Sequence, residues 1–188
     1  MLITLISKPN SILPEKIIFP LTITTKLGQA TLKGDSLKDD IDALNGTLWN
    51  WQQFLRALAT HGCDGKTRLK RLYLMGSKES ATDLPQCKGI AEQYFSNIEV
   101  SCYEMPIDFE NVEEVMGGFS RIVKAERGKN TPDRDIVIDV TGGQKTASIA
   151  AALITLTSKI TFQYVQTNPP YGVIAYDVIS EVPFTLSG

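Results

Sequence analysis

Residues 136–147 have the sequence IVIDVTGGQKTA, and this stretch decides the class of fold. Positions 136–140 form a short β-branched run interrupted by one acid, which is typical of a strand buried in a parallel sheet. The pair Gly142-Gly143 ends that run with a turn, and apolar residues at helical spacing follow over 146–157. The stretch therefore predicts a strand, a glycine turn and a helix, which are the first parts of a βαβ unit.

The same alternation of strands and helices extends outward from this stretch. From position 71 onward the predicted order is β-α-β-α-β-α-β-β. The predicted strands span 72–75, 98–105, 136–140, 160–166 and 173–179, and the predicted helices span 84–95, 112–125 and 146–157. The turn at 168–172 is too short for a parallel crossover, so the last two strands should form an antiparallel hairpin. We predict an α/β, Rossmann-like three-layer sandwich with a mostly parallel sheet ending in a β-hairpin.

The N-terminal third adds a strand, a hairpin and helical segments. Positions 2–6 predict a buried strand, and 17–32 predict a hairpin whose first arm Pro20 would confine to a sheet edge. An apolar helical stripe follows Ser36, and the pair Asn45-Gly46 predicts a break in it. The stripe runs through Leu37, Ile41, Leu44, Leu48, Trp51, Leu55 and Leu58. Because Trp49 lies two positions from Trp51, one indole should be exposed for a partner.

Composition excludes several classes of protein. The 188 residues, 43% hydrophobic and 21% charged, suit one soluble globular domain over 1–188. Nineteen Lys and Arg against 21 Asp and Glu leave a net charge of −2, which disfavours binding of duplex nucleic acid. The basic run at 66–71 could attract an anion, although such a run is usually a solvated loop.

No metal or cofactor site is predicted. The chain has three cysteines without a CxxC pair and one histidine, His61, with no nucleophile partner at a motif, so we identify no catalytic residue. Reduced thiols are expected in a cytoplasmic protein. The longest weakly polar stretch, 147–157, is about half of the ~20 residues that cross a bilayer. We expect no membrane span within this chain and leave open a tether outside it.

Three loops at the expected carboxyl ends of strands carry the candidate site. The first contains Thr141, Gly142, Gly143, Gln144, Lys145 and Thr146. Its glycines, helix-start amides and lysine are suited to a phosphate group. Gln144 stands where a Walker A loop needs glycine, and the spacing is not GxGxxG, so ATP hydrolysis and NAD binding lose support. The other two loops, 7–11 and 76–80, are ordinary capped loops unless they converge with the first.

The stretch 138–146 resembles the D-x-T-G-G-T-K motif of CARF domains, the CRISPR-associated Rossmann-fold sensors of cyclic oligoadenylates in type III CRISPR systems. The order of elements over most of the chain is also similar to that family. Gln144 departs from the usual threonine, and the segment 17–35 resembles an insertion.

The resemblance implies a cyclic oligoadenylate ligand, most simply cyclic tetra-adenylate, in a pocket shared by a homodimer, with no cofactor. The implied ligand-binding residues are Ser7, Asn10, Ser11, Gly76, Ser77, Thr141, Gly142, Gly143, Gln144, Lys145 and Thr146, and Tyr171 is a candidate for stacking on adenine. The implied role is a sensor that regulates an effector segment or partner outside this chain. The alternative is a metal-independent ring nuclease that cleaves the messenger in the same pocket, with Lys145 stabilising the developing charge.

The C-terminal part of the chain has few charged residues, and two interpretations of this remain open. From Thr146 to the end of the chain only Lys159, Asp177 and Glu181 are charged. Such a segment is either a subunit interface or simply part of the core.

Overall fold

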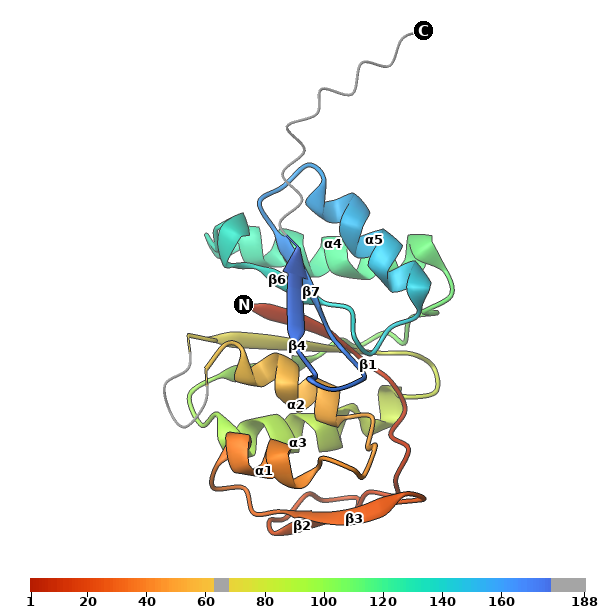
Figure 1. Cartoon of the computed structure of the whole chain (residues 1–188). Helices are drawn as coiled ribbons and strands as arrows, with labels where there is room; N and C mark the ends of the chain where they lie inside the picture. Colours follow the sequence, from red (N-terminus) through yellow and green to blue (C-terminus); the bar gives the residue numbers. More distant parts are fainter. Residues whose placement is uncertain (63–67, 177–188) are drawn as a thin grey trace, which may run out of the picture.

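The computed structural model describes residues 1–62 and 68–176 as a central sheet with helices on both faces (Figure 1). The strands are β1 (Leu2–Ile6), β2 (Leu21–Thr25), β3 (Gly28–Leu32), β4 (Arg71–Gly76), β5 (Glu99–Cys102), β6 (Val137–Asp139), β7 (Thr161–Val165) and β8 (Val173–Tyr176). The α-helices are α1 (Leu37–Ala43), α2 (Gln52–Ala59), α3 (Leu84–Tyr94), α4 (Val112–Gly128) and α5 (Lys145–Thr155), with two 3₁₀ turns at Ala81–Asp83 and Asp133–Asp135.

The main sheet has six strands in the order β5-β4-β1-β6-β7-β8. The first five are parallel, with Leu2 beside Leu72 of β4 on one side and beside Val137 of β6 on the other. The last pair, β7 and β8, is antiparallel. This arrangement confirms the predicted mostly parallel sheet that ends in a hairpin.

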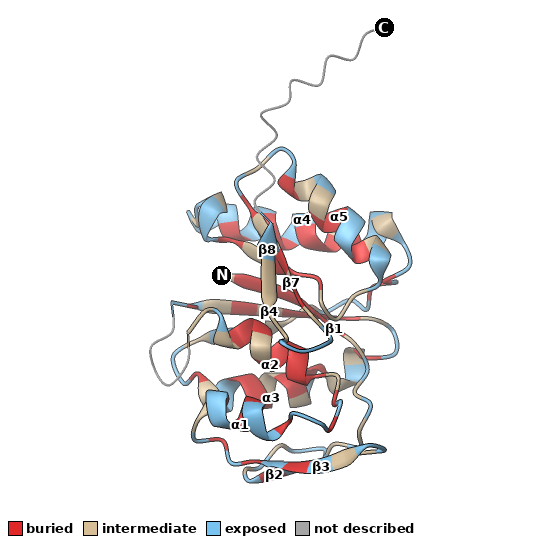
Figure 2. Ribbon diagram, viewed as in Figure 1, coloured by how far each residue is buried: buried red, intermediate tan, exposed pale blue. Residues whose placement is uncertain are grey.

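Two hydrophobic cores lie on the two faces of the sheet, as Figure 2 shows by the buried residues on both sides of it. The alternation of side chains along β1 divides them, because successive residues of a strand point to opposite faces. Leu2 and Ile6 pack with the core formed by α1, α2 and α3, whereas Ile3 and Leu5 pack with the core formed by α4 and α5. All five residues of β1 are buried, which explains its continuous apolar sequence.

The hairpin predicted in 17–32 is present, but it is not an edge of the main sheet. Strands β2 and β3 pair only with each other and lie outside α1 and α3 (Figure 1). Leu21, Ile23 and Leu32 are buried and extend the core of that face. Strand β3 leads into α1, where the buried carboxylate of Asp40 accepts hydrogen bonds from the backbone N–H groups of Lys33 and Gly34 at 2.8 and 2.7 Å.

The prediction that one of Trp49 and Trp51 is exposed was wrong, since both side chains are buried. The predicted break at Asn45-Gly46 separates α1 from α2, and α2 begins only at Gln52, so helical spacing does not apply at 48–51. Leu48 there has a positive φ of 51° and a side chain that is 48% exposed. Leaving the helix at this point lets the indoles lie together, with their ring centroids 5.8 Å apart.

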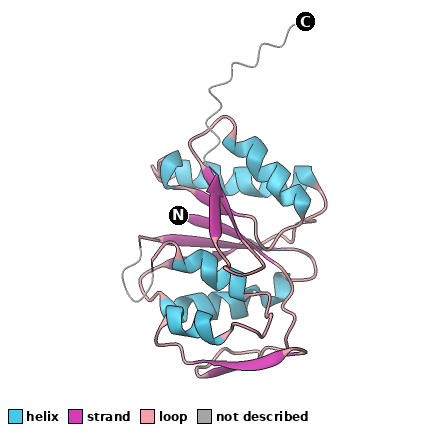
Figure 3. Cartoon of the chain, in the orientation of Figure 1, coloured by secondary structure: helices cyan, strands magenta, loops and turns pink. Residues whose placement is uncertain are grey.

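Figure 3 shows the helices, strands and loops of the chain. Several of their boundaries differ from the predictions. Strand β5 covers only Glu99–Cys102 of the predicted 98–105, because the chain turns away toward α4 at 103–111. Helix α5 ends at Thr155 instead of 157. Positions 177–179 of the predicted last strand, and 66–67 of the basic run, lie outside the described residues, as does Cys63.

Within the described ranges no helix is long and apolar enough to cross a bilayer. The same residues contain no group of three or more His, Cys, Asp or Glu that could hold a metal ion.

Candidate functional site

The candidate site lies where the direction of strand addition reverses. From β1 the chain adds β4 and β5 on one side of the sheet, then returns to place β6 and β7 on the other side. The loops that leave β1 and β6 therefore diverge at the same edge, and such a point in an open α/β sheet forms a crevice for ligands. The residues that follow these two strands, Ser7 and Thr141, both line a recess at this edge.

The glycine pair after β6 is required by the packing of the protein itself. A Cβ atom on Gly142 would lie 1.9 Å from the carbonyl oxygen of Leu5, and one on Gly143 would lie 2.5 Å from side-chain atoms of Leu5 and Ala147. The turn is closed by a hydrogen bond from Gly143 N to Val140 O at 3.0 Å. The sequence assigned the glycines to the approach of a phosphate, and in the structure they also allow close packing of the turn against β1 and α5.

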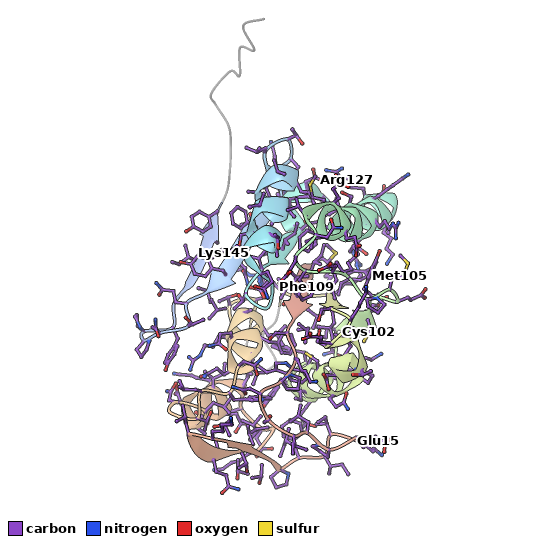
Figure 4. All side chains as sticks on the ribbon, turned by 90° about the vertical axis from the view of Figure 1, so that its right-hand side faces the viewer. Glu15, Cys102, Met105, Phe109, Arg127 and Lys145 are labelled. Carbon is purple, nitrogen blue, oxygen red and sulfur yellow. The ribbon has the colours of Figure 1, made fainter. Side chains whose placement is uncertain are left out.

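The start of α5 is the part of this loop that faces outward. Lys145 is the first residue of the helix and Gln144 is its N-cap, and both side chains are exposed. Gln144 makes no side-chain capping hydrogen bond, and the first amides of a helix have no acceptor within the helix. Ala147 N already donates to Gln144 O at 3.0 Å, so the amides before it and the Lys145 ammonium group are the donors that an anion could use. Figure 4 labels Lys145 here, in the region that also contains Phe109.

Thr146 has a structural contact. Its hydroxyl donates a hydrogen bond to the carbonyl oxygen of Phe109, in the segment that leads into α4. This bond joins the first turn of α5 to the neighbouring loop and engages the Thr146 hydroxyl within the protein.

The loop after β1 is tied to the chain that enters α2. Asn10 and Asn50 form a reciprocal pair: Asn10 N donates to Asn50 Oδ1 at 2.9 Å, and Asn50 N donates to Asn10 Oδ1 at 3.2 Å. Asn50 Nδ2 also donates to Ser7 Oγ at 3.0 Å, and the indole N–H of Trp51 donates to Ser7 O at 2.8 Å. Asn10 is thus engaged in holding the loop, whereas the Ser7 hydroxyl still has its own proton to donate.

The loop after β4 is held to the end of β1 by Ser80. Its buried hydroxyl donates to Ile6 O at 2.6 Å and accepts from Ser77 N at 2.9 Å. A Cβ atom on Gly76 would lie 2.9 Å from the Cα atom of Ala81, so this glycine also serves close packing. The loop therefore enters the site as a rigid turn that presents Ser77 and Lys78.

A buried carboxylate lies beneath the three loops. Asp139 ends β6 and is 1% exposed. Thr4 Oγ1 donates to Asp139 Oδ2, and Thr141 Oγ1 donates to Asp139 Oδ1, both at 2.7 Å. Burial raises the pKa of Asp139 from its ordinary value of 3.8 to about 6, although the hydrogen bonds from Thr141 and Thr4 favour the charged form. Thr141 Oγ1 also accepts from Val165 N at 2.8 Å, so its hydroxyl both donates and accepts a hydrogen bond within the protein.

Two adjoining recesses open at this edge, and both include Ser7 and Gly142. The first, which we call the loop recess, has a volume of about 400 Å³ and is lined by Ser7, Lys8, Ser77, Lys78, Glu79, Ile107, Asp108, Phe109, Glu110, Gly142 and Gln144. The second, which we call the α2 recess, has a volume of about 270 Å³. Its polar lining includes Ser7, Asn50, Gln53, Asp139, Thr141 and Thr167.

Most but not all predicted site residues come together here. Ser7, Ser77, Thr141, Gly142 and Gln144 line the two recesses, and Gly143 and Lys145 continue the same turn. Asn10, Ser11, Gly76 and Thr146 line neither recess.

Sequence reasoning missed Asn50, Gln53, Thr167 and Asp139 as lining residues. Asp139 could have been found, because it is the acidic position of the motif at 139–145. Nothing local marks Asn50, which reaches the site only through its pairing with the loop after β1.

Tyr171, the predicted stacking residue, lies away from these recesses. The Arg56 guanidinium is 4.3 Å from the centroid of the Tyr171 ring. One face of the ring is therefore covered by a side chain of α2, and neither recess includes it.

No family model matches this chain, and no solved structure matches it. A protein of Aquifex aeolicus (strain VF5), described as an uncharacterized protein, is 37% identical to it over 115 residues. The matched part is 59% of this chain and 36% of the Aquifex protein, so the chain covers well under two thirds of that relative's own length.

Proposed function

We propose that this chain is a sensor domain that binds a cyclic oligoadenylate across a two-fold dimer. One observation carries the proposal: the loops after β1, β4 and β6 line a single recess at the switch point of the sheet. That recess adjoins the exposed start of α5, where the motif resembles that of CARF domains. A cyclic oligoadenylate has a closed ring of phosphodiesters, for which helix-start amides and lysines are suitable partners.

The charges around the loop recess indicate where the phosphates would lie. Lys8 and Lys78 are on its lining, and Lys145 begins the adjoining helix. Three acidic residues, Glu79, Asp108 and Glu110, also line it. A polyanion would therefore avoid the wall at 108–110 and lie toward the Lys8 and Gln144 side, next to the α5 amides.

The size of the recess supports a second copy of the chain. A cyclic tetranucleotide is larger than the drug-sized ligands that pockets of roughly 300–1,000 Å³ enclose. The loop recess, at about 400 Å³, can hold only part of such a ring. Two copies related by a two-fold axis would present the same loops twice to a ligand that has matching internal symmetry.

An apolar stripe on α5 offers a surface for that contact. Ile149, Leu153 and Leu156 lie four and three positions apart, so they share one helix face, and they are 52%, 44% and 38% exposed. Figure 2 shows exposed residues on α5 on the side away from the sheet. The stripe begins one turn after Lys145, so a partner packed on it would bring its own Lys145 toward the same ligand.

Calorimetry with cyclic tri-, tetra- and hexa-adenylate, with linear tetra-adenylate as the control, tests the proposal. We expect one cyclic ligand to bind per two chains and the linear control to bind weakly. Sedimentation of the parent and of Leu153→Glu tests the dimer, and we expect the variant to be monomeric and to bind the ring poorly. Absence of binding to every cyclic ligand contradicts the proposal.

Chromatography of the same mixtures separates a sensor from the ring nuclease. We expect the ring to remain intact, since Asp139 is 1% exposed and is not among the residues that line the loop recess. Multiple turnovers to linear products without added metal would instead favour the enzyme.

A further inference from the structure

A separate basic recess lies at the opposite end of the sheet. It opens beside the amino ends of β1, β4 and β6 and has a volume of about 560 Å³. We call it the basic recess, and its lining comprises Met1, His61, Arg68, Leu69, Lys70, Arg71, Lys129, Asn130, Thr131, Pro132, Arg134, Asp135 and Val137. Strand β1 separates it from the loop recess by about five residues of extended chain, roughly 16 Å.

The lining of the basic recess is strongly positive for a chain whose net charge is −2. Five of its side chains are cationic: Arg68, Lys70, Arg71, Lys129 and Arg134. Asp135 is the acidic residue of the described lining, and Glu126 lies behind it as the buried partner of two of the cations. The cationic excess is local, so it creates an attractive potential that the net charge of the chain conceals.

Glu126 holds part of this cluster in a fixed arrangement. Its side chain is fully buried, and its Oε2 accepts from Arg71 Nε at 2.7 Å and from Thr131 Oγ1 at 2.9 Å. Its Oε1 accepts from Tyr73 OH at 2.8 Å and lies 3.0 Å from Lys129 Nζ. Arg71 also donates through Nη2 to Thr131 at 2.6 Å, so the orientation of its guanidinium group is fixed before any ligand binds. Ordering of cationic groups in advance lowers the cost of binding an anion.

The remaining cations are unneutralised. Arg68, Lys70 and Arg134 are exposed and form no ion pair among the described residues. Among the described residues of the lining, His61 is the aromatic side chain, and Phe, Tyr and Trp do not occur there. The recess is therefore suited to binding an anion by electrostatic attraction, with Arg71 held in place by Glu126 and the other cationic side chains exposed to solvent.

We propose that the basic recess binds a polyphosphate anion, meaning two or three linked phosphate groups. Arg71 would contact one phosphate through the Nη protons that Glu126 and Thr131 leave unused, and Lys70, Arg68 and Arg134 would neutralise the others as flexible cations. The recess is large enough for a triphosphate, and the five cationic side chains of its lining favour recognition of the phosphate chain itself. This site is independent of the proposed cyclic oligoadenylate site.

Calorimetry at low salt with inorganic tripolyphosphate tests this, with citrate as a multivalent anion that contains no phosphate. The test variant is Lys70→Glu combined with Arg134→Glu, because both side chains are exposed and unpaired in the described structure. The matched control is Lys16→Glu combined with Lys26→Glu, which makes the same charge change near the β2–β3 hairpin. We expect tripolyphosphate to bind the parent at least tenfold more tightly than citrate does. The test variant should lose at least tenfold in affinity, and the control less than twofold.

Equal affinities for tripolyphosphate and citrate, or equal losses in the two variants, would overturn the proposal. A parallel titration with ATP distinguishes a free polyphosphate ligand from a nucleotide ligand. Equal affinity for ATP and tripolyphosphate indicates that the site recognises the phosphate chain alone, and tighter binding of ATP indicates that it recognises a nucleotide. Binding of a single-stranded oligonucleotide without binding of either triphosphate would also overturn it. The double variant at Lys70 and Arg134 should leave binding of the cyclic oligoadenylate unchanged, because neither residue lines the loop recess, so failure at that site and failure here are distinguishable.

Discussion

Two buried carboxylates at opposite ends of the sheet have opposite electrostatic surroundings. Glu126, near the amino ends of the strands, contacts Arg71 and Lys129. Asp139, at the carboxyl end of β6, accepts hydrogen bonds from the hydroxyls of Thr4 and Thr141. Burial raises the pKa of both groups, but in Glu126 the hydrogen bonds from Tyr73, Lys129, Thr131 and Arg71 outweigh it and lower the pKa to about 2. In Asp139 burial dominates, and the pKa is about 6.

The difference separates a carboxylate that stabilises the fold through ion pairs from a carboxylate that lies beside the proposed ligand site. At the amino end, cations neutralise the acid and are fixed by it, so the acid stabilises the fold. At the carboxyl end, the acid accepts hydrogen bonds from neutral groups, among them the hydroxyls of Thr4 and Thr141, and forms no ion pair within the described ranges. Lys8, Lys78 and Lys145 form no salt bridge within the described ranges, which leaves them for an external anion.

The largest expected effect on stability comes from the close contact between Gly142 and the backbone of β1. In Gly142→Ala the new Cβ atom would meet the backbone oxygen of Leu5 at 1.9 Å, and backbone cannot move aside as a side chain can. We expect the free energy of unfolding to fall by at least about 4 kcal/mol, measured by urea denaturation. Gly117→Ala, in mid-helix with nothing within 4 Å, is the control and should stabilise by ~0.5–1 kcal/mol. Similar values for the two variants would contradict this.

The acid at the amino end is the next test. Glu126→Gln should destabilise the protein by about 3–4 kcal/mol at pH 7, because it breaks a buried ion pair. The value lies in the lower part of the range for such pairs, because the partners Arg71 and Lys129 are partly exposed. Asp133→Asn, which breaks the exposed pair with Arg127, should cost less than about 1 kcal/mol. Since the pKa of Glu126 is lowered, its stabilisation is present above pH 4.5 and is lost as the pH falls toward 2. A smaller loss of unfolding free energy for Glu126→Gln than for Asp133→Asn would contradict the conclusion that Glu126 stabilises the amino end of the sheet.

Asp139 should show the opposite dependence on pH. Its pKa is higher in the folded chain, so the folded state binds the proton more tightly, and stability falls as the pH rises from about 4 through 6. The fall should reach about 3 kcal/mol, since one pKa unit corresponds to about 1.4 kcal/mol. Urea denaturation between pH 4 and 7.5 should show a flatter profile for Asp139→Asn than for the parent. Parallel profiles would mean that Asp139 is as well solvated as an exposed acid.

The smallest effect is expected at the lysine that begins α5. Lys145→Ala should weaken binding of the cyclic oligoadenylate by about 2 kcal/mol, roughly 30-fold, as for loss of one hydrogen bond to a charged group. Its unfolding free energy should be unchanged, because the Lys145 side chain is exposed. Lys159→Ala, an exposed lysine beyond the other end of α5, is the control for loss of charge. Unaltered affinity in calorimetry at matched low salt would remove Lys145 from the proposed site.

The sequence by itself determined the class of fold and the position of the main loops. Apolar runs of strand length and apolar stripes at helical spacing are local patterns, and each is visible without knowledge of its neighbours. Their alternation predicted the parallel sheet, because a parallel strand pair needs a crossover long enough for a helix. The loops at 7–11, 76–80 and 141–146 could be placed at one edge for the same reason.

Only the tertiary structure decided what the residues in those loops do. The bond from Thr4 to Asp139 joins residues 135 positions apart, and the bonds from Asn50 to Ser7 and Lys8 join residues more than 40 apart, so no local pattern marks them. The glycine pair has the spacing of a ligand cradle, yet its role in packing against β1 depends on where Leu5 lies. Trp49 and Trp51 are both buried because the chain leaves helical geometry at Leu48. Periodicity records the average environment of an element, whereas the partner of a single side chain depends on contacts that form only when distant segments meet.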